Sequence, residues 1–560
     1  MKTTNKLSCN AIVDVLAARG VRDIVISPGS RNAPLILAAK SEPRLRCHVV
    51  IDERSAAFVG LGIAIETQRP VALVCTSGSA VLNYGPALSE AFYRHVPLIA
   101  VTADRPSEWI DQDDSQTIRQ NGIFENIVKA SFELDTDNGT VAQRRFFERT
   151  VNDALNTAVE LPQGPVHINV RLDQPLECIT ERDSQFKAIP FVRSFQETIP
   201  VFDSAIIDRL QDKKILIVAG FGSPDSELNE AVSRFAVKTG AAVMFEAQSN
   251  LNPCCPSVPN IDVTLSSLTQ EQLSELTPDI VISFGGSLVS RMLKTYLRGC
   301  DRLEHWHIGP SQRLIDCFLH LTRQFDCCPS ALFKKLNDII GDTTTRDYGL
   351  KWAQASQKAS LRASEMARTS EWSDLKAMSM IIAAIPGHWH LQLSNGTAVR
   401  YTQLFDYKHI ARIDCNRGVS GIDGCTSTAV GAHIYYNDVT LLVTGDMSAA
   451  YDIGALGLRQ ITPRFKIAVL NNGGGGIFRF VSSTSSLDCL EECFVAKPNL
   501  PLHKLAEAYG YAYYEVDCEN NFEHNFKTFV EETERPAILN IITPGQLSGE
   551  ILKEFFKNLR

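Results

Sequence analysis

The sequence predicts an α/β protein made of three doubly wound, parallel-sheet domains. Short β-rich apolar runs alternate with longer helix-like stretches along most of the 560 residues, which is typical of parallel sheets with helices on both faces. The chain is too long for one hydrophobic core, and domains of about 150 to 200 residues fit its length. Mixed polar or charged stretches near residues 176–200 and 343–376 are interpreted as linkers. We therefore expect domains at residues 1–185, 200–345 and 375–560.

The composition is that of an ordinary soluble globular protein, with 44% hydrophobic and 21% charged residues. Its net charge of −9 makes a nucleic-acid partner unexpected. The polar amino-terminal segment and the lack of an apolar run of about 18 residues favour neither export nor a membrane span. Fifteen scattered cysteines without a CxxC pair predict free thiols in a reducing compartment, so we expect a cytoplasmic protein.

The first domain places polar residues directly after its strands. Strand-like runs occupy residues 23–27, 47–51, 71–75, 98–102 and 166–170. Polar residues follow four of these runs, at 27–31, 52–54, 76–79 and 103–106. Because ligands bind outside the carboxyl ends of strands in open α/β sheets, this edge is the expected ligand edge.

The middle domain carries only part of a dinucleotide fingerprint. Gly220 and Gly222 follow an apolar run, but Ser226 stands where the third glycine belongs, and no acidic residue follows at a well-defined strand end. Nucleotide binding is therefore disfavoured. His305 and His307 alternate along one strand-like run, and without a nearby acidic or cysteine cluster we interpret them as packed strand residues, not metal ligands.

The third domain contains a β-α-β unit with oxygen ligands at both strand ends. An apolar run ends in Gly445-Asp446, a helical stretch follows, and a second apolar run ends in Asn471-Asn472 before the glycines at 473–476. Neighbouring parallel strands would place Asp446 and Asn472 side by side. A carboxylate, an amide oxygen and a glycine carbonyl suit magnesium, and the glycines let the backbone approach a diphosphate.

This unit resembles the diphosphate anchor of thiamine-diphosphate enzymes, with Met447 where many members have a second glycine. The family fold also needs a carboxylate on the aminopyrimidine ring and an apolar side chain that bends the cofactor. Glu53, directly after a strand-like run, has the position of that carboxylate. Taken alone, Glu53 is better explained as a first-turn helix residue with Asp52 as N-cap, and only together with the anchor motif does the catalytic interpretation lead.

Longer motifs are similar to those of the 2-succinyl-5-enolpyruvyl-6-hydroxy-3-cyclohexene-1-carboxylate synthases of menaquinone biosynthesis. They are SPGSRNAPL (27–35), IDERSAAFVGLG (51–62), TSGSAVLNYGPALSEA (76–91), TADRPSEW (102–109), SQTIRQNGIF (115–124) and NRGVSGIDG (416–424). The resemblance implies aminopyrimidine-binding, central and diphosphate-binding domains. It also implies a transferase that decarboxylates 2-oxoglutarate and adds the succinyl carbanion to isochorismate. The cofactors implied are thiamine diphosphate and Mg²⁺ or Mn²⁺.

The resemblance also assigns site residues. Metal ligands would be Asp446, Asn472 and the Gly474 carbonyl; cofactor contacts would be Glu53, Ile422, Ser448, Asn472 and Ile477. Substrate contacts would be Ser30, Arg31, Arg105, Gln116, Arg291, Arg400, Arg417 and Phe478. Arginines suit two dicarboxylate substrates because the guanidinium fork binds carboxylates bidentately.

Two positions depart from the family pattern. Gly396 replaces a serine found in relatives, for which Ser394 is a candidate substitute, and Met292 follows Arg291 where relatives can have a second basic residue. We expect a homodimer or homotetramer, because in this superfamily the domain of the glutamate meets the anchor domain of a second subunit. Two alternatives remain: another thiamine-diphosphate lyase or transferase of the acetolactate-synthase or decarboxylase type, and a non-catalytic protein of the same fold.

Overall fold

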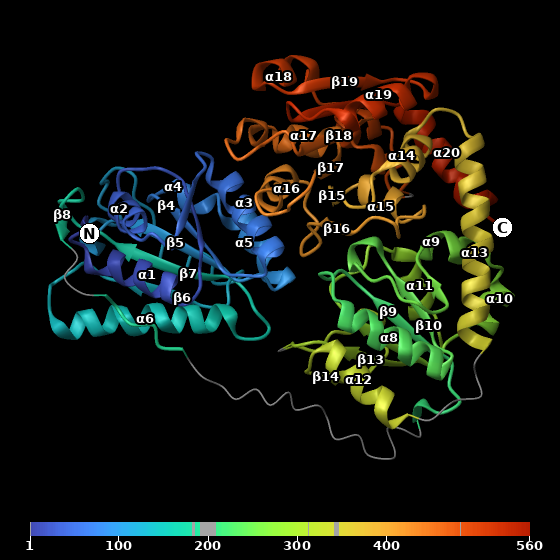
Figure 1. Ribbon diagram of the computed structural model, residues 1–560, viewed down its shortest axis with the longest axis horizontal. Helices are drawn as coiled ribbons and strands as arrows, with labels where there is room; N and C mark the ends of the chain where they lie inside the picture. Colours follow the sequence, from blue (N-terminus) through green and yellow to red (C-terminus); the bar gives the residue numbers. More distant parts are fainter. Residues whose placement is uncertain (1, 182–184, 191–208, 312, 341–346, 482) are drawn as a thin grey trace. The chain divides into compact units, whose positions relative to one another are not determined.

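The computed structural model describes residues 2–181, 185–190, 209–311, 313–340, 347–481 and 483–560. It contains three six-stranded parallel sheets, as the sequence predicted (Figure 1). The predicted domain ends at residues 1, 200 and 345, and part of each predicted linker, lie outside the described residues. Before the first gap, β8 (Ile179–Glu181) pairs with β1 (Lys2–Thr4) as a short antiparallel ribbon.

The first sheet has the strand order β3-β2-β4-β5-β7-β6. Its strands are β2 (Asp23–Ile26), β3 (Arg46–Val49), β4 (Val71–Cys75), β5 (Leu98–Asp104), β6 (Ser131–Leu134) and β7 (Val166–Arg171). Its helices are α1 (Leu7–Ala18), α2 (Ala33–Ser41), α3 (Glu53–Thr67), α4 (Ser79–Leu82), α5 (Gly85–Arg94) and α6 (Val141–Val159). The five predicted strands are present, and β6 is an additional edge strand that the sequence analysis missed.

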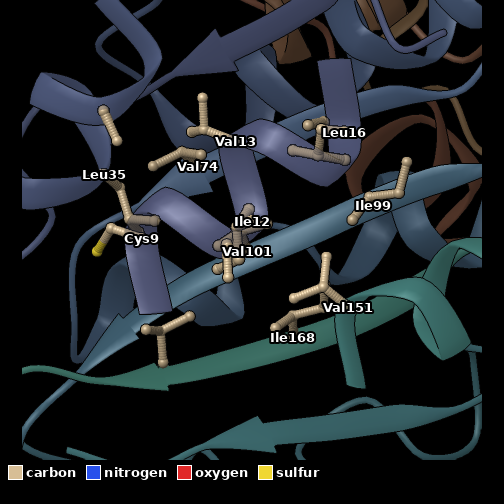
Figure 2. Close-up of a cluster of buried hydrophobic side chains, with 14 of the residues drawn as sticks. Cys9, Ile12, Val13, Leu16, Leu35, Val74, Ile99, Val101, Val151 and Ile168 are labelled. Carbon is tan, nitrogen blue, oxygen red and sulfur yellow. The ribbon is translucent and has the colours of Figure 1, made fainter. Parts of the chain in front are cut away.

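Alternate residues of these strands enter two separate cores, one on each face of the sheet. Ile99 and Val101 of β5 pack with α1, α2 and α6, whereas Leu98 and Ala100 pack with α3, α4 and α5. Figure 2 shows the first core, in which side chains of α1 meet those of the central strands. Side chains that alternate between two buried faces explain why the strands are apolar throughout. This is the doubly wound arrangement that the sequence predicted.

The middle sheet has a different order, β11-β10-β9-β12-β13-β14. Its strands are β9 (Ile215–Ala219), β10 (Ala242–Phe245), β11 (Ser257–Val258), β12 (Ile280–Phe284), β13 (Glu304–Ile308) and β14 (Leu321–Phe325). Its helices are α8 (Ser226–Thr239), α9 (Ile261–Ser267), α10 (Gln270–Glu275), α11 (Arg291–Arg298) and α12 (Pro329–Ile339). This 3-2-1-4-5-6 order is that of dinucleotide-binding domains, with its crevice between β9 and β12.

Backbone and one aromatic ring close that crevice. A Cβ on Gly220 would lie 1.8 Å from the Gly286 carbonyl oxygen, and a Cβ on Gly286 would lie 2.1 Å from the Phe221 ring. Contrary to the sequence analysis, an acidic residue, Glu246, does directly follow a strand. Its carboxylate accepts hydrogen bonds from the backbone N–H groups of Val289 and Ser290. The structure therefore disfavours nucleotide binding here because Gly286 and the Phe221 ring fill the crevice, and not because an acidic residue is missing.

Part of the second predicted linker is an integral helix of this domain. Helix α13 (Asp347–Thr369) packs against α9, β10 and β11. Its Tyr348 and Trp352 belong to the core that also contains Val281. The charged, alanine-rich composition correctly indicated a helix, but the two buried aromatic residues attach it to the middle sheet.

The two histidines of β13 are buried around Ser283, as the packed interpretation predicted. The Ser283 Oγ lies 2.7 Å from His305 Nε2 and 2.9 Å from His307 Nδ1. Burial lowers the pKa of each histidine to about 4. Among the residues that the structure describes, no group of three or more His, Cys, Asp or Glu side chains could hold a metal.

Acidification is therefore expected to destabilise the protein through these histidines. An unfolded histidine has a pKa near about 6.5, so between that pH and about 4 the unfolded chain binds more protons than the folded one. The free energy of unfolding should fall by about 1 kcal/mol per histidine between pH 7 and pH 5.5. Urea unfolding at both pH values measures this, and His305→Asn should flatten the pH dependence. The exposed His524→Asn is the control, and an unchanged slope in His305→Asn would contradict the assignment.

The third sheet repeats the strand order of the first, as β16-β15-β17-β18-β20-β19. Its strands are β15 (His390–Leu393), β16 (Arg412–Cys415), β17 (Thr440–Gly445), β18 (Phe465–Asn471), β19 (Ala512–Val516) and β20 (Ala537–Ile542). The helices of this region are α14 (Asp374–Ala384), α15 (Ala398–Thr402), α16 (Cys425–His433), α17 (Asp446–Tyr451), α18 (Leu502–Tyr509), α19 (Glu519–Glu531) and α20 (Gly545–Asn558). The first and third sheets thus share a topology that the middle sheet lacks.

The contacts divide the chain into two compact units. The first holds the described residues up to 190 with Gly418–Thr440 and Tyr451–Phe465, and the second holds the remainder of the described chain. In the first unit α3 packs on α16 so closely that a Cβ on Gly62 would lie 2.0 Å from the Thr428 carbonyl oxygen.

All fifteen cysteines lie in the described part of the chain and are free thiols, as predicted. Within that same part, no helix is both long and apolar enough to cross a membrane.

Candidate active site

Asp446 lies between two neighbouring strand ends of the third sheet, as the sequence predicted. It is the first residue of α17, directly after β17, and it is 2% exposed. Its Oδ2 accepts the N–H of Gly474 at 2.7 Å, and its Oδ1 accepts the N–H of Met447 at 2.7 Å. Burial raises the pKa of the Asp446 carboxyl to about 6. The Asp446 carboxylate thus ties the end of β17 to the glycine loop after β18.

Asn472 presents an unused oxygen in the same place. Its Nδ2 donates to Asp374 at 2.6 Å, whereas its Oδ1 is buried and has no hydrogen-bond partner within the described chain. Gly474 has a φ of +126°, and a Cβ there would lie 2.2 Å from the Val495 carbonyl oxygen, so no side chain fits. A carboxylate, an orphaned amide oxygen and a glycine-lined loop fit a hard divalent cation with a diphosphate.

Other predicted site residues of this unit lie near Asp446 or directly after the glycine loop along the chain. Ser448 is buried on α17, two residues after Asp446. Ile477 and Phe478 lie on the short 3-10 helix that follows the glycines (Gly476–Arg479), where the Phe478 ring packs edge-on against Phe494. Ser394, the candidate substitute for the serine missing at Gly396, accepts a hydrogen bond from the Gly445 N–H at 3.3 Å through its Oγ. That hydroxyl therefore supports the end of β17.

Three of the predicted arginines gather in the same unit. The pKa of the Arg400 guanidinium is lowered by burial and by the nearby charges of Arg417 and Arg291. Arg417 is 8% exposed, and its Nη1 donates to Asn395 Oδ1 at 3.0 Å. The Nε groups of Arg400 and Arg417 are buried without a hydrogen-bond acceptor among the described residues. Clustered cations with unused donors are suited to an anionic ligand.

Glu246, which the sequence analysis overlooked, holds the start of α11 beside this arginine cluster. Its two carboxylate oxygens accept the N–H groups of Val289 and Ser290 at 2.8 and 2.7 Å. Arg291 is the next residue and the first of α11. The Glu246 carboxylate thus fixes the turn that carries Arg291.

Glu53 belongs to the first unit and is the first residue of α3. Asp52 caps this helix, because its Oδ1 accepts the N–H groups of Arg54 at 2.9 Å and Ser55 at 3.3 Å. The predicted N-cap is therefore present, and the Glu53 side chain is left half-buried at the start of the helix. Ile422 precedes α16, the helix that packs against α3.

The substrate contacts predicted in the first unit lie on loops at the carboxyl edge of its sheet. Exposed Ser30 follows β2 next to Arg31, whose Nη1 donates to the Leu172 carbonyl oxygen at 2.7 Å. Burial and the charge of Arg105 lower the pKa of Arg31, so these two arginines are neighbours. Gln116 donates to the Ser77 carbonyl oxygen at 3.2 Å. The structure thus brings Arg31 and Arg105 together.

Arg105 also has a partner that the sequence analysis did not anticipate. Its Nη1 lies 2.9 Å from Asp114 Oδ2, and its Nη2 donates to the Ser115 carbonyl oxygen. Asp114 and Gln116 line an open cavity of about 430 Å³ with Asp111, Asp113 and neighbouring residues. Arg105 is therefore paired with an acidic loop at the edge of a cavity.

Comparison with known proteins identifies the family. The model described as "Thiamine pyrophosphate enzyme, N-terminal TPP binding domain" matches residues 9–123. The model described as "Middle domain of thiamine pyrophosphate" matches residues 183–391.

Relatives that match nearly the whole chain identify the family more specifically. A 2-succinyl-5-enolpyruvyl-6-hydroxy-3-cyclohexene-1-carboxylate synthase of Porphyromonas gingivalis is 38% identical over 99% of this chain and 97% of its own length. The synthase of the same name from Flavobacterium johnsoniae is 36% identical over 98% of both chains. That of Bacteroides fragilis is 32% identical over the whole of both chains. The chain therefore belongs to the 2-succinyl-5-enolpyruvyl-6-hydroxy-3-cyclohexene-1-carboxylate synthase family of thiamine-diphosphate enzymes.

Proposed function

We propose that this protein is the thiamine-diphosphate-dependent synthase of menaquinone biosynthesis. It decarboxylates 2-oxoglutarate and joins the remaining four-carbon unit to isochorismate, releasing carbon dioxide. The observation that supports this most is the arginine cluster of the second unit, which shares that unit with the Asp446–Asn472 loop. Both substrates are dicarboxylates, and clustered guanidinium groups, two of which keep an unused Nε–H donor within the described chain, suit such ligands.

Asp446, Asn472 and the Gly474 carbonyl would hold Mg²⁺ or Mn²⁺, and Ser448 would contact the diphosphate. The orphaned Asn472 Oδ1 supports this assignment, because leaving a buried acceptor unused costs about 1–3 kcal/mol unless an ion satisfies it. An oxygen-rich donor set without cysteine or histidine favours a hard cation over a soft one.

When bound, thiamine diphosphate would supply a nucleophilic carbon for the 2-oxo acid and an acceptor for the electron pair released by decarboxylation. Glu53 would exchange a proton at its carboxylate with the aminopyrimidine ring. Ile422 would support the cofactor from one side, and Ile477 and Phe478 would line the substrate site and exclude water. In this scheme Arg291, Arg400 and Arg417, with Ser30, Arg31, Arg105 and Gln116, orient the two dicarboxylates.

The reaction is tested with thiamine diphosphate, Mg²⁺, 2-oxoglutarate and isochorismate, by following isochorismate absorbance together with carbon dioxide release. We expect turnover with this pair and none with pyruvate as the sole 2-oxo acid. Turnover with pyruvate, and none with 2-oxoglutarate and isochorismate, would instead assign an acetolactate-synthase-type activity.

Arg400→Ala and Arg417→Ala are each expected to raise the KM for a dicarboxylate substrate about 10–100-fold, since a hydrogen bond to a charged group contributes about 1.5–3 kcal/mol. Affinity for thiamine diphosphate should change little. Steady-state kinetics and calorimetry measure the two effects separately. Arg209→Ala is the matched control, because Arg209 is an exposed arginine paired with Glu304. A loss of cofactor affinity with an unchanged KM would remove these arginines from the substrate site.

We further propose at least a homodimer. Sedimentation equilibrium distinguishes a dimer from a tetramer by mass. An apolar surface beside Glu53 supports an interface there: Ile51 is 81% exposed, and Val49 and Tyr451 are each more than half exposed. Tyr451 lies close to the start of α3, because the Arg54 guanidinium lies over the Tyr451 ring, 5.0 Å from its centroid. Contiguous exposed apolar side chains mark association surfaces.

Hybrid dimers show whether Glu53 and Asp446 of one site come from different subunits. A dimer of one Glu53→Gln chain and one Asp446→Ala chain, isolated with two affinity tags, would then contain one intact site. We expect about half of the wild-type activity from it, although each parent dimer is inactive. A hybrid as inactive as its parents would mean that both groups of a site belong to one chain.

A further inference from the structure

We propose that Asp374 is a positioning residue that fixes the side-chain amide of Asn472 with its oxygen toward the bound metal ion. This inference rests on the proposed metal site. Asp374 is the first residue of α14, far from Asn472 in the sequence, and it is 1% exposed.

Three segments of the chain meet at Asp374. Its Oδ2 accepts the hydrogen bond from Asn472 Nδ2 at 2.6 Å, and its Oδ1 accepts one from Thr543 Oγ1, at the end of β20. The backbone N–H of Asp374 donates to Ser548 Oγ on α20 at 3.0 Å. Both carboxylate oxygens are thus used, and the side chain is held in one orientation.

This contact determines which end of the Asn472 amide faces the metal position. An ionised carboxylate only accepts hydrogen bonds, whereas an amide has an NH₂ donor at one end and an oxygen acceptor at the other. Turning the amide over would place Asn472 Oδ1 against the Asp374 oxygen and present NH₂ to a cation. The observed orientation instead leaves Oδ1 without a partner among the described residues.

The surrounding packing keeps Asn472 at this place. Its carbonyl oxygen accepts from Arg479 Nη1 at 3.2 Å, and a Cβ on Gly545 would lie 2.1 Å from the same oxygen. A Cβ on Gly476 would lie 2.5 Å from Asn472 Nδ2. With the backbone held on one side, rotation of the amide is the main remaining freedom, and Asp374 removes it.

A purely structural role for Asp374 makes a different prediction. As a first-turn helix residue it also meets the positive end of the α14 dipole, so its loss would lower stability in any case. Only the positioning role requires that Asp374 affect the metal through Asn472. A double-mutant cycle separates the two roles.

The test measures Mn²⁺ binding to the full-length protein at saturating thiamine diphosphate, by electron paramagnetic resonance of free Mn²⁺. We expect Asp374→Asn, which keeps the side-chain shape, to raise the Kd about 10-fold, as outer-shell substitutions do. In an Asn472→Ala background the same change should raise the Kd less than about two-fold. Asp414→Asn, a buried carboxylate of β16 paired with Arg412, is the control.

The possible outcomes test two proposals separately, namely the positioning role of Asp374 and the metal site itself. An unchanged Kd in Asp374→Asn, or an equal rise in both backgrounds, would overturn the positioning role. If Asp374→Asn does not fold, Thr543→Val, which removes one partner of the carboxylate, should raise the Kd in the same background-dependent way, and no rise would overturn the proposal. A wild-type protein that binds no Mn²⁺ with thiamine diphosphate would instead remove the proposed metal site itself.

Discussion

Glu53→Gln is expected to lower kcat by about 10²–10⁴-fold, the usual contribution of a side chain that transfers a proton in the transition state. Glu53 stands at the start of α3 with its carboxylate half-buried, and Asp52 already supplies the helix cap. Glutamine keeps the size and the hydrogen-bonding ability of the side chain but cannot take up and release a proton. Affinity for thiamine diphosphate should therefore change only a few-fold.

Deuterium exchange at the reactive carbon of bound thiamine diphosphate measures this effect directly. We expect exchange to slow in Glu53→Gln in parallel with kcat. Asp52→Ala is the matched control, because it removes the neighbouring carboxylate and the N-cap. That control should cost about 1 kcal/mol of stability and leave exchange fast. Wild-type exchange in Glu53→Gln would show that another group moves the proton.

Asp446→Ala is expected to weaken metal-dependent binding of thiamine diphosphate at least about 100-fold, since even outer-shell partners of a metal contribute about 10–100-fold. The substitution removes the carboxylate that would bind the ion. It also leaves the N–H groups of Gly474 and Met447 without the acceptor that orders the loop.

Asp438→Ala is the matched control for this prediction. Asp438 lies just before β17, at the end of the strand opposite Asp446, so its loss should leave the affinity within about two-fold of the wild-type value. Calorimetric titration of both variants with thiamine diphosphate and Mg²⁺ gives the comparison. Equal affinities in Asp446→Ala and Asp438→Ala would exclude a metal bound by Asp446.

Sequence analysis located the central strands but missed several at the sheet edges. Strands β6, β11, β14 and β19 were not predicted, and each is the last strand at one edge of its sheet. A central parallel strand is buried on both faces and is apolar throughout, whereas an edge strand is shorter or partly exposed and has no such pattern. In β14 only the last residue, Phe325, is fully buried.

The site residues that belong to a local motif could be found from the sequence, whereas those with distant partners could not. Asp446 and Asn472 could be found because consecutive strands of one β-α-β unit place them at fixed positions. Asp374 and Glu246 could not, because their partners lie 98 and 43 residues away along the chain. A single acidic residue has no local pattern that distinguishes a buried hydrogen-bond acceptor from a solvated charge.

We propose that this chain binds thiamine diphosphate through a metal held at Asp446 and Asn472. Calorimetric titration of the wild-type protein with thiamine diphosphate, with and without Mg²⁺, tests it most directly. We expect saturable heat at one site per chain, and only in the presence of Mg²⁺. A wild-type titration without heat in the presence of Mg²⁺, or with the same heat after the metal is chelated, would contradict it.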